Sequence, residues 1–347
     1  MGAQNRGVSV LPTTDSIIVT IKHLPSAINS SFSEYACRLL PDSTFLYTSL
    51  RNDADEDAEH FFETNWYCYL YVSKAFPDGK FDLPKPLPKA INHPKYFNGN
   101  FWISEDGQRM ILTRCVRSSE GDLLCDLWQT EKSKGIWKKP MPLPSEINKK
   151  GSSSMQPFLL QTTDYEVLYF VSDRTGGYGG TDIWYSVCKE GRYQPPVNLG
   201  PIINTEGNEV TPFYDMAHNM LYFSSDDHHS MGDFDIFCSE GALGRWQPVK
   251  HLDEPFNSLY NDFYFVVNQD GNSAFFSSNR PLHDAVDDDT CCNDIFIVHW
   301  SLPEKDTVTL PPKPDIHEKI ASVLPITLYF QNDYPDPKSI SDTTTKD

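Results

Sequence analysis

Hydrophobic and polar positions along the chain fall into short strand-like runs that return in a fixed order. One mark occurs five times and consists of Leu, three variable residues, Ile or Phe, and then Asn. Successive asparagines of the mark are 63, 56, 56 and 53 residues apart. The five copies of the mark are residues 24–29, 87–92, 143–148, 199–204 and 252–257. This spacing predicts an internal structural repeat.

Each repeat contains the same parts in the same order. A short first strand (as in 211–214) and a turn (as in 269–271) come before an aromatic-rich strand that ends in small polar residues (as in 221–226). A polar loop and a third strand that begins Asp-Ile-aromatic (as in 182–184) follow, and a fourth strand leads into the mark. Four short antiparallel strands in about 40 to 50 residues are typical of a propeller blade.

The two ends of the pattern predict how the ring closes. The fifth repeat stops after its third strand at 294–299, and a strand-like run at 16–21 stands before the first mark. We predict that this run completes the last blade and so removes an exposed sheet edge. The expected fold is an all-β, five-bladed propeller of four-stranded antiparallel blades over residues 16–301. An N-terminal extension (1–15) and a Pro-rich linker and tail with one strand-like segment (302–347) would flank it.

Composition and charge narrow the class of partner. The chain has 29 Lys and Arg against 48 Asp and Glu, a formal net charge of -19, which disfavours a nucleic-acid partner. No apolar run approaches the roughly 20 residues of a membrane-spanning helix, so we expect no transmembrane segment. No cofactor is expected either, because the Gly-rich run 176–180 leads into a strand, whereas a phosphate cradle needs a helix N-terminus.

The third repeat carries a family resemblance. Residues 169–174 (YFVSDR) followed by 179–184 (GGTDIW) resemble the TolB-type, WD-like propeller repeat. A narrower similarity is to propellers of outer-membrane-associated proteins of Bacteroidetes, which often lie beside an OmpA-like peptidoglycan-binding domain. Residues 324–333 look like the opening strand of such a domain, and since the chain stops at residue 347 we expect a fragment or a truncated paralogue.

The resemblance implies a non-enzymatic scaffold that binds a protein or peptidoglycan-linked partner. It also implies a periplasmic or outer-membrane-associated location, although no signal peptide is visible in the chain. Binding would fall on the loop surfaces, especially the loops 52–65 and 281–293, whose aromatic residues either anchor a partner or pack beneath their own loop. The binding-face candidates are Phe61, Phe62, Trp66, Asn100, Glu209 and Asp262.

The alternative is a carbohydrate-active enzyme of the glycoside hydrolase type. Acidic residues stand near the start of three first strands, at Glu34, Glu209 and Asp262, with Asn100 and Ser154 in the other repeats. First strands line the axis of a propeller, so these carboxylates could meet at the channel mouth as general acid and as base or nucleophile. The competing interpretation is a polar channel or hydrogen bonding between blades.

Other polar residues point to structure rather than chemistry. The Asn of each mark recurs with the fold, and we expect it to shape the turn between blades, because Asn tolerates left-handed backbone and its side chain can bond its own backbone. Asp226, Asp227, His228 and Asp233 cluster in one loop and are a weak candidate for a metal site, without the alternating spacing of a calcium loop. Cys115 and Cys125 flank one hairpin, so a disulfide between them is plausible.

Overall fold

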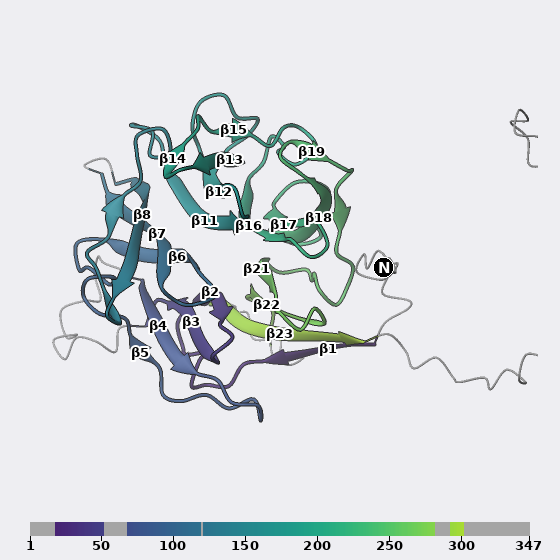
Figure 1. The fold of residues 1–347 in the computed structure, drawn as a ribbon. Coiled ribbons are helices and arrows are strands. Elements are labelled where there is room, and N and C mark those ends of the chain that lie inside the picture. Colours follow the sequence, from purple (N-terminus) through teal and green to yellow (C-terminus); the bar gives the residue numbers. More distant parts are fainter. Residues whose placement is uncertain (1–17, 52–67, 119–120, 282–291, 302–347) are drawn as a thin grey trace, which may run out of the picture. The chain divides into compact units, whose positions relative to one another are not determined.

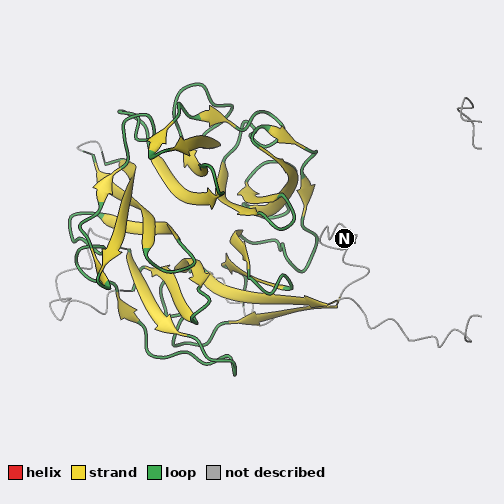
Figure 2. Cartoon of the chain, in the orientation of Figure 1, coloured by secondary structure: helices red, strands yellow, loops and turns green. Residues whose placement is uncertain are grey.

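The computed structural model describes residues 18–51, 68–118, 121–281 and 292–301. Every regular element in these ranges is a β-strand (Figure 2). The strands form five small antiparallel sheets arranged around one axis (Figure 1). The part of the chain that the structure describes accordingly holds no helix capable of spanning a membrane. The prediction of an all-β, five-bladed propeller is confirmed.

Each blade consists of consecutive strands from the axis outward. The first strands, which surround the axis, are β2 (Glu34–Leu39), β6 (Phe97–Ile103), β11 (Ser154–Gln161), β16 (Glu209–Asp215) and β21 (Asp262–Val267). The second strands are β3 (Thr44–Ser49), β7 (Arg109–Arg117), β12 (Glu166–Ser172), β17 (Met220–Ser225) and β22 (Ser273–Ser278). The third strands are β4 (Tyr69–Lys74), β8 (Leu123–Ser133), β13 (Asp182–Lys189), β18 (Asp235–Ala242) and β23 (Asp294–Ser301). We number the blades 1 to 5 in this order.

The outer edge of blades 2, 3 and 4 is divided into two short strands. These pairs are β9 (Ile136–Trp137) with β10 (Met141–Pro142), β14 (Arg192–Tyr193) with β15 (Val197–Asn198), and β19 (Arg245–Trp246) with β20 (Lys250–His251). In blade 1 the outer strand is β5 (Lys85–Pro86). The short, broken outer strands leave little continuous edge for pairing with another chain.

Blade 5 is completed by the N-terminal strand. β1 (Ile18–His23) pairs antiparallel with β23 in continuous register from Ile18 opposite Ser301 to His23 opposite Phe296. Figure 1 shows these two strands side by side at the junction of the first and last blades. The predicted closure of the ring is therefore confirmed, and the two ends of the propeller are joined by main-chain hydrogen bonds.

The hydrophobic core consists of five clusters, one between each pair of neighbouring blades. Each cluster contains the Leu and the Ile or Phe of one mark, such as Leu24 and Ile28 between blades 5 and 1. The second strands β17 and β22 are buried along their whole length. Both faces of each blade are covered in this way, which explains why the sheets need neighbours on both sides.

The asparagine of each mark acts through its side chain. The Asn29 amide accepts a hydrogen bond from Ile295 N (2.9 Å) and donates to Ile295 O (3.0 Å) and Leu24 O (3.1 Å). The other four asparagines bond the third strand of their own blade in the same manner. None of the five has left-handed backbone, so that part of the prediction was wrong. Bonding to the nearby main chain is seen, because Asn29 donates to Leu24 O.

Candidate functional site

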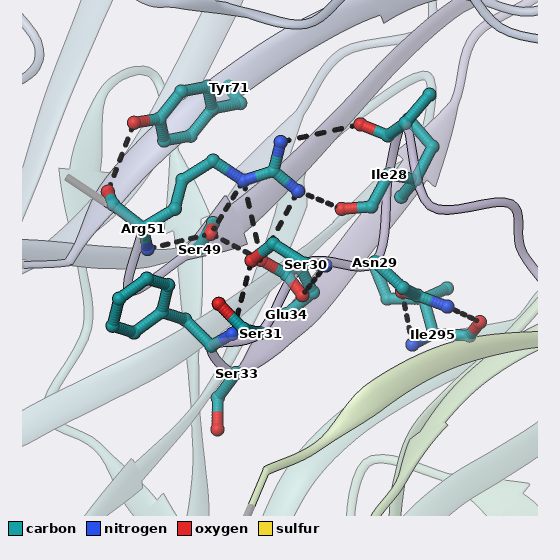
Figure 3. Close-up of polar contacts among 12 residues, drawn as sticks. Ile28, Asn29, Ser30, Ser31, Ser33, Glu34, Ser49, Arg51, Tyr71 and Ile295 are labelled. Carbon is teal, nitrogen blue, oxygen red and sulfur yellow. Dashed lines mark hydrogen bonds and ion pairs between the residues drawn. The ribbon is translucent and has the colours of Figure 1, made fainter. Parts of the chain in front are cut away.

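The three carboxylates considered as catalytic candidates lie inside the framework. Glu34 is fully buried at the start of β2 and accepts hydrogen bonds from Ser30 Oγ and Ser49 Oγ, both at 2.6 Å, and from Ser30 N at 2.8 Å. Arg51 forms an ion pair with it at 3.3 Å. Figure 3 shows this set of contacts at the turn before β2. Burial raises the pKa of the Glu34 carboxyl, although the hydrogen bonds and Arg51 act in the opposite direction.

Glu209 and Asp262 repeat this arrangement in blades 4 and 5. Glu209 accepts from Thr205 Oγ1 (2.5 Å) and Thr205 N (2.8 Å), and Asp262 pairs with Arg280 at 2.6 Å. Both side chains are fully buried, and burial raises the pKa of each carboxyl. These carboxylates accept hydrogen bonds from the donor groups of the turn before each first strand. None of the three lines a cavity at the axis of the propeller.

Near the end of each second strand, a basic side chain contacts a main-chain carbonyl of the mark that precedes that blade in the sequence. In four blades an arginine donates to main-chain carbonyls of the mark and lies between 4.8 and 5.7 Å from aromatic ring centroids. These residues are Arg51, Arg114, Arg174 and Arg280. In blade 4 His228 takes this place, with Nε2 2.8 Å from Ile203 O and its ring centroid 5.9 and 5.4 Å from those of Phe223 and Phe237.

Because His228 contacts the main chain of the mark, it is explained without a metal ion, although it belongs to the predicted metal site. The neighbouring Asp226 accepts hydrogen bonds from Asn208 N (2.6 Å) and Asn208 Nδ2 (2.7 Å), and Asp227 accepts from His228 N (2.8 Å). Asp233 is exposed. Across the described ranges, no group of three or more His, Cys, Asp or Glu is arranged to hold a metal ion.

The channel at the axis is narrowed by a bulge in every first strand. Each bulge places one residue in left-handed backbone, with φ between 44° and 57°. These residues are Ala36, Asn100, Gln156, Thr211 and Tyr264. A bulge redirects the side chains that follow it, and non-glycine residues in this region carry local strain, which often marks a functional site.

Polar side chains of the bulges meet across the axis. Tyr264 Oη donates to Asn100 Oδ1 at 2.6 Å, and Gln156 Nε2 donates to Tyr264 Oη at 3.3 Å. Thr211 N donates to Gln156 Oε1 at 2.8 Å, and Tyr264 stacks on Tyr35 with ring centroids 5.5 Å apart. These contacts form a polar floor across the channel, beside a small inner cavity of about 60 Å³.

A larger cavity opens from the channel toward the turn face, the end of the propeller that carries the hairpins between first and second strands. It has a volume of about 750 Å³, within the roughly 300–1,000 Å³ range of small-molecule sites. We call this cavity the turn-face funnel. Arg38, Trp102, Phe158 and Phe213 line both the inner cavity and the funnel.

Charged groups surround the mouth of the funnel. Glu105, from the turn after β6, is exposed and forms no hydrogen bond or ion pair within the described ranges. Asp215, at the end of β16, contacts His218 Nδ1 at 2.6 Å and accepts from Ala217 N at 2.9 Å. The funnel therefore presents carboxylates on blades 2 and 4, which are separated by blade 3.

The remaining candidates lie elsewhere. Phe61, Phe62 and Trp66 lie outside the described residues. Asn100 lines the inner cavity, but Asn98 rather than Asn100 occupies the position in β6 equivalent to Glu34, because it pairs opposite Arg114 as Glu34 pairs opposite Ser49. The structure joins Cys115 and Cys125, directly opposite each other on β7 and β8, by a disulfide.

Sequence reasoning missed the funnel residues. The turn that holds Glu105 repeats its Asp-Gly at 270–271 but not the Glu, and Asp215 ends β16 outside any repeated motif. A signal for Arg38 was present, because the first strands can be aligned on the marks and Arg38 then falls in a column of apolar residues.

Comparison with known proteins gives resemblance in fold only. No protein-family model matches the chain, and no curated protein matches it. An endo-arabinase from Bacteroides thetaiotaomicron is 14% identical, with 81% of this chain and 98% of that chain covered and a TM-score of 0.48. The catalytic domain of a GH62 α-L-arabinofuranosidase from Coprinopsis cinerea is 10% identical, with coverage of 82% and 98% and a TM-score of 0.48. A protein of unknown function from Dyadobacter fermentans is 14% identical, with coverage of 80% and 79% and a TM-score of 0.46.

These comparisons correct two predictions. The resemblance to TolB-type and OmpA-associated propellers finds no counterpart among these structures, several of which are glycoside hydrolases. The prediction of a non-enzymatic binding scaffold depended on that resemblance and is contradicted, together with the expectation that the chain is not an enzyme. At these identities and TM-scores the likeness describes the fold, and activity must be argued from the site itself.

Proposed function

We propose that this protein is a carbohydrate-active enzyme and that the turn-face funnel is its active site. The observation that carries the proposal is the placement of Glu105 and Asp215 on two non-adjacent blades at the mouth of one cavity. Glycoside hydrolysis uses two carboxyl groups on opposite sides of the scissile bond. The cavity wall adds Trp102, Phe158 and Phe213, and aromatic faces present the flat apolar surface on which a sugar ring can rest.

The contacts of the two carboxylates suggest different roles. Asp215 is oriented by His218 Nδ1 and Ala217 N, and a base or nucleophile needs such a fixed orientation. Glu105 forms no hydrogen bond or ion pair in the described ranges, so its side chain can turn toward the leaving oxygen, the position of the general acid. Asp106, next to it, accepts from Ser104 Oγ (2.5 Å) and Gln108 N (3.0 Å) and is committed to its turn.

Glycan turnover by amide variants tests the proposal. Wild type, E105Q and D215N are compared on a panel of neutral and acidic oligosaccharides, with E240Q as control because Glu240 is exposed on β18 outside the funnel. We expect E105Q and D215N to lose at least about 100-fold in kcat, the scale of general acid–base catalysis, and E240Q to match wild type. Absence of turnover by wild type, or full activity in both amide variants, would overturn the proposal.

The same assay separates the funnel from the buried carboxylates. E34Q and D262N should change the melting temperature, because these groups satisfy buried donors, and should leave kcat of the folded protein close to wild type. If E34Q abolishes turnover at an unchanged melting temperature, the active site lies at the starts of the first strands instead.

A further inference from the structure

Five equivalent side chains surround the inner cavity, and four of them, all but Val266, also line the turn-face funnel. We call this ring of five the neck. Each stands two residues after the left-handed residue of its first strand and lines the inner cavity. These residues are Arg38, Trp102, Phe158, Phe213 and Val266. Four are apolar and one is a cation, so Arg38 interrupts a ring that could otherwise be closed by hydrophobic packing.

Arg38 has no partner for its charge. Within the described ranges, no side chain or carbonyl forms a hydrogen bond or ion pair with its guanidinium, which lies 5.7 Å from the centroid of the Phe213 ring. Glu105 acts on it only through longer-range Coulomb attraction, and burial lowers the pKa of Arg38. The side chain is half-buried, and a charge that is partly withdrawn from water without a partner is costly.

The other arginines near the channel show the contrast. Arg51 and Arg280 pair with buried carboxylates, and Arg109 pairs with Glu166 at 2.5 Å. Arg38 instead projects from β2 immediately after the bulge at Ala36 (φ 51°). The bulge is the local feature that directs this side chain into the neck, where both cavities reach it.

We infer that the turn-face funnel takes an acidic sugar and that Arg38 binds its carboxylate. A guanidinium matches the planar geometry of a carboxylate and can bind it through two parallel hydrogen bonds. The sugar ring then lies against the aromatic wall at Phe213. This inference rests on the proposed function and specifies its substrate class as a uronic acid.

The overall charge of the protein makes the local cation necessary. A chain with a net charge of -19 repels anions at long range. Arg109 also lines the funnel but is paired with Glu166, so binding of a uronate should depend mainly on Arg38.

Calorimetric titration with D-galacturonate and D-galactose tests the inference. The two probes differ in the carboxylate alone, and inorganic phosphate is a third probe. We expect wild type to bind D-galacturonate at least about tenfold more tightly than D-galactose, and R38Q to bind both sugars equally. R38K keeps the charge without the planar fork, so it should retain part of the preference. R245Q is the control, because Arg245 is exposed on β19 outside the funnel.

The outcomes distinguish this inference from the proposed function. A preference for D-galacturonate that persists in a folded R38Q, or Arg38-dependent binding of phosphate alone, overturns the uronate assignment. The uronate assignment is also overturned if R38Q changes the pH profile of turnover but leaves the ratio of the two sugar affinities unchanged. Arg38 would then act on the charge of Glu105 and not on the substrate. Arg38-dependent uronate binding without glycan turnover upholds the binding site and refutes the enzyme.

Discussion

Replacement of Asn29 by Ala should destabilise the propeller at its closure. The side-chain amide makes three hydrogen bonds of 2.9 to 3.1 Å to the main chain, two to Ile295 on β23 and one to Leu24 O, and it also contacts His23 Nε2 at 2.9 Å. Ile295 O keeps a bond from Leu24 N at 3.1 Å, but Ile295 N loses its partner inside the protein. At roughly 1 kcal/mol for each bond, N29A should lower the free energy of unfolding by about 3 kcal/mol.

Thermal unfolding and hydrogen exchange measure this effect. For a domain of this size 1 kcal/mol corresponds to roughly 2 °C, so the melting temperature should fall by about 6 °C. N148A is the matched variant, because Asn148 makes the same three bonds to Leu127 and Leu143 within a continuous stretch of chain. Both variants should lose similar stability, and only N29A should accelerate amide exchange in β1. Unfolding free energies within about 0.5 kcal/mol of wild type in both variants would refute the reasoning.

Three further predictions concern the framework. H228A should lose about 1–2 kcal/mol of stability relative to H229A in chemical denaturation, because both residues have left-handed backbone and only His228 bonds a buried carbonyl; equal losses would contradict this. Burial raises the pKa of Glu209 above its ordinary value of 4.5, so its contribution to stability is greatest below pH 4.5 and decreases as pH rises through the folded-state pKa. The stability of E209Q relative to wild type should therefore increase with pH over that window, and a parallel pH dependence would count against it. Replacing both Cys115 and Cys125 by Ser should cost up to about 3 kcal/mol, as expected for a loop of 10 residues, and an unchanged melting temperature would exclude a stabilising disulfide.

The ring of blades could be predicted from the sequence because the mark recurs at regular intervals along the chain. Each blade needs a Leu and an Ile or Phe for the cluster beside it and an Asn for its third strand, so the mark returns with every blade. The missing last mark and the extra first strand predicted the pairing of β1 with β23. Envelope localisation stays a prediction from resemblance.

The site could not be located in the same way. A carboxylate at the start of a first strand has the same sequence appearance whether it faces the channel or the turn before its strand, and Glu34 faces the turn. The left-handed residue of each bulge stands two residues after the position of Glu34, so in β6 that position is Asn98 and Asn100 is the bulge residue itself. The place of Glu105 in the candidate site can be recognised only from the structure, where the turns surround one cavity.

The most direct test of the funnel is a crystal structure of the protein with D-galacturonate. The account predicts the sugar in the turn-face funnel, with its carboxylate at hydrogen-bonding distance, about 2.7–3.2 Å, from the Arg38 guanidinium and its ring beside Phe213. A sugar bound at the opposite face of the propeller, or seated in the funnel with its carboxylate directed away from Arg38, would contradict it.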